Sequence, residues 1–168
     1  METERLILRR YIGEDLEDLY EYLSDVETVR YEPYKPMSFE ETRQELEYRI
    51  SSSEFIAVEL KDTHKMIGNI YLGGRDSNTL EIGFVFNKDY WKRGYASEAC
   101  NSLISEAFSN GIHRIYAECD PDNTASWRLL ERRGFIREGY FKQNVYFWVD
   151  ENNRPIWKDT YVYSLLNE

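Results

Sequence analysis

A short basic turn joins a strand-like run to a helix-like run in "VFNKDYWKRGYASEAC", residues 85–100. Lys88, Lys92 and Arg93 supply positive charge there, and the small residues Gly94 and Ala96 would let a ligand approach the backbone. The first turn of a helix has free N–H groups and the positive end of the helix dipole, which suits a phosphate. A helix start with chance cations would have the same residues, and neither common glycine-rich phosphate motif occurs here. The turn alone leaves both interpretations open.

A single acidic residue interrupts an apolar strand in "TLEIGFVFN", residues 79–87. Side chains alternate between the two faces of a strand, so Glu81 lies on the face opposite the apolar residues 80, 82, 84 and 86. A carboxylate placed in this way would accept a proton from an attacking amine, directly or through water. An ordinary glutamate on the solvent face is the alternative.

The stretch "DNTASWRLLERRGF", residues 122–135, predicts a short helix that Asp122 or Asn123 caps and Gly134 ends. It offers the hydroxyl of Ser126 near the helix start. Asn and Ser are both good capping residues, so capping alone would also explain Asn123 and Ser126.

Acidic residues are concentrated near the start of the chain. Between Glu14 and Glu47 the sequence has twelve acidic and three basic residues, a net charge of −9 within a chain of net charge −10. The loop "RYEPYKPMSF" adds Tyr31, Tyr34 and Phe39. Aromatic rings with carboxylates would bind an ammonium group. Solvated helix faces and packing beneath the loop are the alternatives.

The composition excludes several classes of protein. The strong negative charge disfavours nucleic-acid binding. No run is long and apolar enough for a membrane span or a signal peptide, which predicts a cytoplasmic protein. Cys100 and Cys119 are too few for a disulfide framework, and His64 and His113 are isolated, so we expect no metal site.

Periodicity and turn residues predict the order of the elements. The expected helices cover residues 14–23, 38–50, 96–108 and 123–134, and Ser38 with Glu41 forms a capping box at the second of them. The expected strands cover 5–10, 55–60, 65–73, 79–87, 113–119, 135–143, 145–149 and 160–166, of which one is an optional extra strand, with a turn at 74–78. This order predicts an α/β (α+β) fold in one domain, residues 1–168, with helices on both faces of a mixed, mostly antiparallel sheet of six to seven strands. Exposed strand edges allow a homodimer.

Taken together, these blocks resemble the GNAT superfamily of acyl-CoA N-acetyltransferases. The resemblance is strongest to its RimJ/RimL-like branch, which acetylates protein N-termini and small amines. It runs from "TERLILRRYIGEDLEDLYEYLSD" through "EIGFVFNKDYWKRGYASEA" and "DNTASWRLLERRGF" to "WKDTYVYSLL". It implies acetyl-CoA as co-substrate and a sheet splayed in the middle, with a bulge at Gly83 that admits the cofactor.

The resemblance also implies the cofactor contacts. The family's pyrophosphate loop, R/Q-x-x-G-x-G/A, falls on residues 91–96, where Trp91 replaces the usual Arg or Gln. The phosphate contacts then fall chiefly on backbone N–H groups, with Lys92 or Arg93 in support. The implied cofactor-binding residues are Phe84, Val85, Phe86, Trp91, Lys92, Arg93, Gly94, Tyr95, Ala96, Ser97, Asn123 and Ser126.

The family's usual acid, a tyrosine that protonates the departing thiolate, is replaced here by Leu130. Ser126 lies one helical turn earlier, and in RimJ/RimL-like enzymes a serine at this place is linked to the CoA sulfur. Since a thiol has a pKa of about 8.5, a weak donor would suffice. Glu81 is the expected base, with Asp159 and Tyr146 as weaker candidates.

The resemblance implies an N-acetyltransferase that works by direct attack in a ternary complex, without an acetyl-cysteine. It places the acceptor beside the first two helices, where Tyr31, Tyr34 and Glu81 would bind it. We expect a cationic acceptor, the α-amine of a protein N-terminus as in ribosomal-protein acetyltransferases. At pH 7 roughly a tenth of such an amine is neutral, against about one in 2,500 for a lysine-like amine. A polyamine or aminoglycoside-like acceptor and a catalytically silent CoA-binding module are the alternatives.

Overall fold

The computed structural model describes residues 1–74, 76 and 78–168. The predicted turn at 74–78 includes residues 75 and 77 and lies partly outside the described residues. The strands are β1 (Leu6–Arg9), β2 (Phe55–Leu60), β3 (Met66–Gly74), β4 (Thr79–Phe86), β5 (Arg114–Cys119), β6 (Ile136–Val149) and β7 (Pro155–Leu166). The helices are α1 (Leu16–Leu23), α2 (Phe39–Ser51), α3 (Tyr95–Ser109) and α4 (Thr124–Arg132), with 3₁₀ turns η1 (Gly13–Asp15) and η2 (Lys88–Tyr90).

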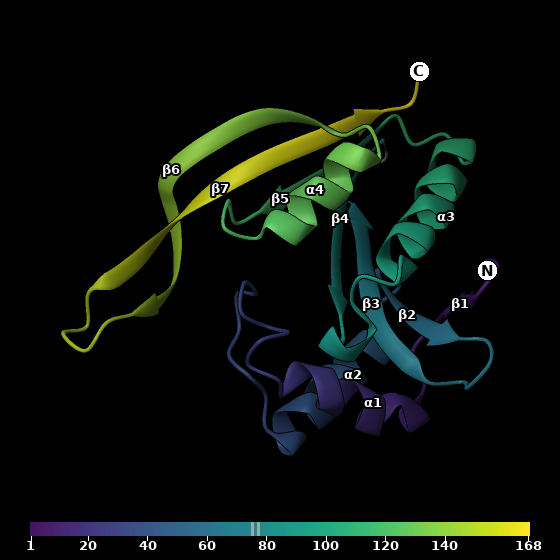
Figure 1. Cartoon of the computed structure of the whole chain (residues 1–168), viewed down its shortest axis with the longest axis horizontal. Coiled ribbons are helices and arrows are strands. Elements are labelled where there is room, and N and C mark those ends of the chain that lie inside the picture. Colours follow the sequence, from purple (N-terminus) through teal and green to yellow (C-terminus); the bar gives the residue numbers. More distant parts are fainter. Residues whose placement is uncertain (75, 77) are drawn as a thin grey trace.

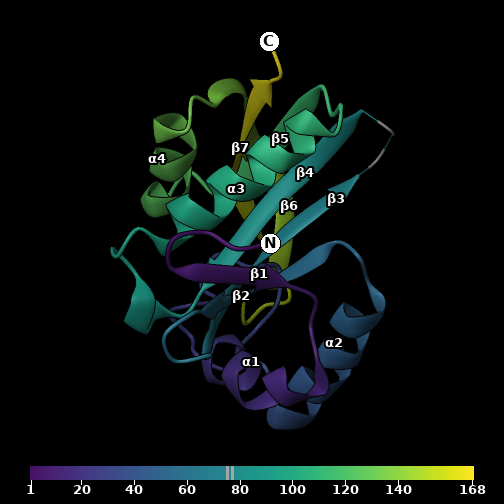
Figure 2. The ribbon, with the colours of Figure 1, turned by 90° about the vertical axis from the view of Figure 1, so that its right-hand side faces the viewer.

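The described residues form a seven-stranded sheet in the order β1-β2-β3-β4-β5-β7-β6. The β4–β5 pair is parallel and the others are antiparallel. Figure 1 and Figure 2 show α3 and α4 grouped apart from α1 and α2. The predicted mixed, mostly antiparallel sheet and the order of its elements are confirmed.

Hydrophobic cores on the two faces of the sheet follow from the alternation of β4. Ile82 and Phe86 pack with α3 and α4, whereas Val85 packs with α1 and α2. Helices on both faces are therefore confirmed. The buried residues of α3 all belong to its apolar period, namely Ala99, Cys100, Leu103, Ile104 and Ala107.

The sheet splays between its two middle strands. β4 pairs with β5 only from Thr79↔Arg114 to Glu81↔Tyr116 and then diverges from it. On its other edge β4 pairs with β3 residue by residue through Tyr71↔Gly83, without a shift of register. The predicted splay is thus confirmed. The predicted bulge at Gly83 is wrong for the β3–β4 pair, because β4 keeps its register with β3 and separates from β5 without a bulge.

The sequence predicted two short strands at 135–143 and 145–149, but the structure has one long strand there, β6, which forms a hairpin with β7. Gln143 adopts a left-handed φ of 47°, and its N–H donates to Asp159 Oδ1 at 2.8 Å. The register shifts between Phe141 and Val145, but the ladder continues. This irregularity explains why the sequence looked like two strands, and Figure 1 shows the hairpin extending away from α3.

Candidate active site

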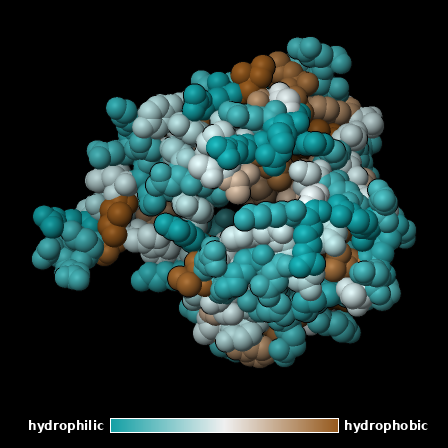
Figure 3. Space-filling model, in the orientation of Figure 1, coloured by the Kyte–Doolittle hydropathy of each residue, from teal (hydrophilic) through white to brown (hydrophobic). Residues whose placement is uncertain are grey.

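Two cavities meet where β4 and β5 separate. The larger, of about 650 Å³, has walls from β4, β5, α2, the loop after α1 and the β6–β7 hairpin. The smaller, of about 360 Å³, lies beside the turn before α3 and the start of α4. Figure 3 shows the molecule hollowed between its upper and lower parts on this face. The cavities share the walls formed by Tyr31, Glu32, Phe84, Val85, Asn123 and Ser126.

The turn before α3 leads into the helix at the place where the sequence predicted a helix start. Gly94 is the N-cap, with a left-handed φ of 84°, and α3 begins at Tyr95. Lys92 is also left-handed, with a φ of 61°. Trp91, Lys92 and Ala96 line the smaller cavity. Among the described residues, Arg93, Gly94, Tyr95 and Ser97 belong to the same turn or first helical turn but do not line that cavity.

Trp91 serves the local structure at the place where the family has Arg or Gln. Its indole N–H donates to the carbonyl of Phe86 at 2.6 Å, which ties the turn to the end of β4. The indole has no acceptor function and a single N–H, so Trp91 cannot replace the charge of an arginine. Trp91 therefore fixes the position of the turn and adds no positive charge to it.

Arg5 holds the turn from outside, which sequence reasoning missed. Its guanidinium donates to the carbonyl of Arg93 at 3.0 Å and lies 4.5 Å from the centre of the Tyr95 ring. It also forms an ion pair with Glu98 at 2.7 Å. Arg5 and the turn are 88 residues apart, so no local pattern could have indicated the contact.

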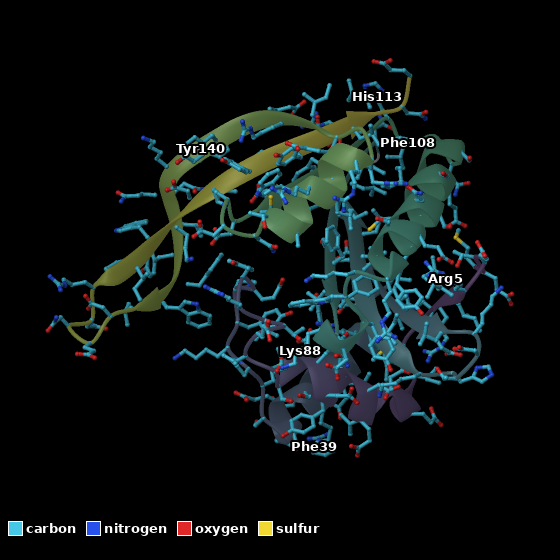
Figure 4. All side chains as sticks on the ribbon, in the orientation of Figure 1. Arg5, Phe39, Lys88, Phe108, His113 and Tyr140 are labelled. Atoms are coloured by element: carbon cyan, nitrogen blue, oxygen red, sulfur yellow. The ribbon has the colours of Figure 1, made fainter. Side chains whose placement is uncertain are left out.

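Of the basic residues near the turn, Lys88 is engaged elsewhere. Its ammonium forms an ion pair with Asp25, in the loop after α1, and Figure 4 shows Lys88 above α1. The hydrogen bond to Asp25 raises the pKa of Lys88, so this lysine is charged, and the carboxylate of Asp25 balances its charge. The side chain of Arg93 stacks over Tyr90 at 5.4 Å. Lys92 is therefore the basic side chain of the turn that lines the smaller cavity.

The start of α4 brings Asn123 and Ser126 to the junction of the cavities. Asn123 caps the helix, since its Oδ1 accepts from the backbone N–H of Ser126 at 3.3 Å. The hydroxyl of Ser126 does not make this cap, so it is available to the cavities. Leu130, at the family's tyrosine position, is buried in the core against α3 and forms no part of the described cavity walls.

Glu81 lies in the wall of the larger cavity, half-buried, and accepts a hydrogen bond from the Tyr116 hydroxyl at 2.9 Å. Asp159 lines the same cavity, where Tyr140 and Gln143 donate to it and lower the pKa of its carboxyl. Tyr146 packs edge-on against Trp157 at 5.2 Å and does not line the described cavities.

Of the three predicted aromatics, Tyr31 and Tyr34 line the larger cavity and Phe39 does not. The Tyr31 hydroxyl donates to the carbonyl of Asp122 at 3.2 Å, which links the loop after α1 to the start of α4. Phe39 is the first residue of α2 and packs edge-on against Tyr20 of α1 at 5.2 Å. Figure 4 shows it at the far side of α2, so its predicted role at the acceptor is wrong.

The larger cavity is acidic, but most of its carboxylates do not come from residues 14–47, the acidic segment of the sequence. Most carboxylates of that segment form ion pairs, for example Asp18 and Glu21 with Lys65. Within the described residues, only Glu32 and Glu45 of the segment line the larger cavity. That cavity nevertheless has more carboxylates (Glu32, Glu45, Glu81, Glu118, Asp120 and Asp159) than cations (Arg49 and Lys158).

Neither cysteine suits nucleophilic chemistry. Burial raises the pKa of both Cys100 and Cys119 to about 12, so the reactive thiolate is scarce at neutral pH. Cys100 is a core residue, whereas Cys119 is only partly buried and lines the larger cavity. Among the described residues no cluster of His, Cys, Asp and Glu could hold a metal ion. In the same ranges, no helix has the length and apolar character needed to cross a bilayer.

The described residues thus combine a splayed sheet with a helix N-terminus on one side of the gap and an acidic cavity on the other. The chain belongs to the GNAT family, since the model of the acetyltransferase (GNAT) domain matches residues 5–136. It is an N-acetyltransferase, and acetyl-CoA is the acetyl donor of this family.

Similar proteins agree with this assignment. The uncharacterized N-acetyltransferase YnaD of Bacillus subtilis is 34% identical over 172 residues, covering 99% of this chain and 96% of that protein. A GNAT-family acetyltransferase from Bacillus anthracis has a crystal structure with a TM-score of 0.89 and 34% identity, covering 99% of this chain and 98% of that one. The ribosomal-protein-serine acetyltransferase of Escherichia coli is 34% identical over 68 residues, covering 40% of this chain and 38% of that protein.

Proposed function

We propose that this N-acetyltransferase moves the acetyl group of acetyl-CoA to a cationic primary amine, the α-amine of a protein N-terminus. The observation that carries the proposal is the meeting of the two cavities at the β4–β5 gap. The smaller cavity ends at a helix N-terminus, which suits an anionic cofactor, and the larger is acidic, which suits an ammonium group.

The cofactor contacts in this proposal follow the strand and the turn. Beyond Glu81, one edge of β4 is not paired with β5, so the backbone of Phe84, Val85 and Phe86 is open to an amide-containing pantetheine arm. The N–H groups of residues 93–97 would hold the pyrophosphate, with Lys92 in support. Asn123 and Ser126 then lie near the thioester, because they line both cavities.

On the acceptor side, Tyr31, Tyr34 and Glu81 would bind the ammonium group. The amine must lose its proton before it attacks, and an α-amine, with a pKa of about 7.7–8.0, needs much less help than a lysine-like amine. Direct attack in a ternary complex fits the unreactive cysteines. Ser126 would donate a proton to the departing CoA thiolate.

The role of Ser126 can be separated from capping. Ser126→Ala keeps the backbone N–H that donates to Asn123 Oδ1, so the helix cap should remain intact. We expect kcat to fall by up to about 10²-fold, the value of one acid catalyst, while the melting temperature hardly changes. Ser105→Ala, an exposed serine on α3, is the matched control. A wild-type kcat for Ser126→Ala would show that the thiolate leaves without its help.

A polyamine or aminoglycoside-like molecule is the second candidate acceptor. The observation that favours it is the excess of carboxylates around the larger cavity, because several separated negative charges suit a polycation better than a single ammonium group.

A release assay for the CoA thiol tests the function and chooses between the acceptors. The purified chain with acetyl-CoA is offered N-terminal peptides, polyamines and aminoglycosides in parallel. We expect acetyl-CoA to raise the melting temperature and one class to release thiol, with peptides first. Thermal stabilisation without release from any amine would instead favour a catalytically silent CoA-binding module.

Finer assignments are also proposals. We propose that residues 1–168 act as one catalytic domain in the RimJ/RimL-like branch. The partial match to the ribosomal-protein-serine acetyltransferase supports the branch. A cytoplasmic location fits the free cysteines Cys100 and Cys119. The homodimer stays a prediction.

A further inference from the structure

Glu32 is an acidic residue at the junction of the two cavities. It lies in the loop after α1, where its backbone N–H donates to the carbonyl of Val29 at 2.9 Å. The residue lines both cavities, as Asn123 and Ser126 do, whereas Glu81 lines only the larger one. A side chain at this junction can reach both an amine in the acidic cleft and the group that the amine attacks.

The carboxyl group of Glu32 is unengaged. It is half-buried, and within the described part of the chain no hydrogen bond or ion pair joins it to another side chain. Other carboxylates of the cleft are held: Glu81 by Tyr116, Glu45 by Arg49 and Asp120 by Lys158. Glu118 has an exposed side chain. Of these groups, Glu32 is therefore the half-buried carboxyl that no other side chain holds.

The surroundings of Glu32 oppose its ionisation. Burial raises the pKa of its carboxyl to about 7, and the positive charge of Arg49 on α2 limits the rise. The other charged or titratable groups that line the larger cavity come from several elements: Tyr31 and Tyr34 of its own loop, Glu45 of α2, Tyr71 of β3, Glu81 of β4, Glu118, Cys119 and Asp120 at the end of β5, and Lys158 and Asp159 of β7. Arg30, on its own loop, Glu27, Lys92 and Asp122 face it from the smaller cavity.

We propose that the Glu32 carboxylate is the general base that takes the proton from the acceptor ammonium, while Glu81 binds that ammonium. The inference rests on the proposed acetyl transfer. One N–H bond of the ammonium breaks and its proton moves to Glu32. The neutral nitrogen then forms the C–N bond as the thioester C–S bond breaks. The Ser126 hydroxyl gives its proton to the thiolate and takes the second proton of the nitrogen in return, and Glu32 releases its proton to water.

The chemistry of the acceptor agrees with this assignment. A base works best when its pKa lies near the working pH, and an α-amine loses its proton at about 7.7–8.0. A carboxyl that titrates near 7 is therefore matched to the proton that it must accept. Only its ionised form is a base, so activity should rise as the pH passes through about 7.

The test compares pH profiles of kcat for the wild type, Glu32→Gln, Glu81→Gln and Glu118→Gln. Each variant removes one negative charge from the same cavity. All are assayed at saturating acetyl-CoA with the amine that releases most thiol. In the wild type we expect kcat to rise near pH 7. The midpoint of that rise should stay the same when the acceptor is replaced by an amine of different pKa. Glu32→Gln should lose that rise and roughly 10²-fold in kcat at pH 8.

The other variants separate a base from a structural residue. Glu81→Gln should keep the rise near pH 7 and raise the KM of the amine, and Glu118→Gln should likewise keep the rise near pH 7. Stabilisation by acetyl-CoA should be the same for Glu32→Gln and wild type. The proposal is overturned if Glu32→Gln keeps both the rise and the rate, or if Glu81→Gln alone loses the rise. A wild type that releases no thiol with any amine would overturn the proposed function, and the role of Glu32 with it.

Discussion

Replacing Gly94 by valine is expected to raise the KM for acetyl-CoA by roughly 10- to 100-fold. Gly94 has a φ of 84°, and a Cβ there would lie 3.3 Å from Arg5 Nη2. Strained backbone of this kind costs about 1–3 kcal/mol for a residue other than glycine. The chain would relieve it by reshaping the turn and displacing Arg5 from the carbonyl of Arg93. The N–H groups that should hold the pyrophosphate would then point elsewhere.

The other end of α3 provides the control. Gly111 has a φ of 87°, and a Cβ there would meet no atom within 4 Å. Gly111→Val introduces the same backbone strain far from the turn before α3. It should therefore lower the melting temperature and leave the KM for acetyl-CoA unchanged. Kinetics with varied acetyl-CoA and thermal melts with and without it give both quantities. Equal changes in KM for the two variants would show that Gly94 has no special role in binding the cofactor.

Local features of the sequence predicted the elements well because their causes are local. The apolar period of α3 comes from residues three and four apart, and the capping box of α2 forms between Ser38 and Glu41, where Ser38 N–H donates to Glu41 Oε2 at 2.7 Å. The alternation around Glu81 placed that side chain correctly on one face of β4. Each of these patterns is complete within a few residues.

The features that sequence reasoning missed depend on distant partners. Glu32 is half-buried because its loop is fastened by the Tyr31–Asp122 bond, and by a bond from Met37 N–H to the carbonyl of Leu23 at 2.9 Å. In "ELEYRI" Arg49 looks like a helix surface residue, yet it is only 2% exposed. No pattern within a short window contains these contacts.

Arg49 lines the larger cavity and belongs to a buried polar network. Its guanidinium donates to the Tyr11 hydroxyl at 3.1 Å, Asn69 Oδ1 at 2.9 Å and Glu45 Oε1 at 2.8 Å. The Tyr22 hydroxyl also donates to Asn69 Oδ1, at 2.8 Å. Removing one member of such a network leaves the other buried polar groups unsatisfied.

We therefore expect Arg49→Met to lower the free energy of unfolding by about 3–5 kcal/mol, measured by urea denaturation at pH 7. Methionine keeps the apolar stem but cannot hydrogen-bond Tyr11, Asn69 or Glu45. Arg43→Met on the same helix is the control. Arg43 is exposed and pairs with Glu40 and Glu47, so its loss should matter far less. Similar losses for both variants would mean that the network adds little to stability.

The same substitution also tests the electrostatics of Glu32. The charge of Arg49 lowers the pKa of the Glu32 carboxyl, which burial raises to about 7. Without Arg49 that pKa should rise further, so the ionised base would appear only at higher pH. The midpoint of the activity rise should therefore move upward in folded Arg49→Met and stay in place in Arg43→Met. An unmoved midpoint in Arg49→Met would mean that another group sets the pH dependence.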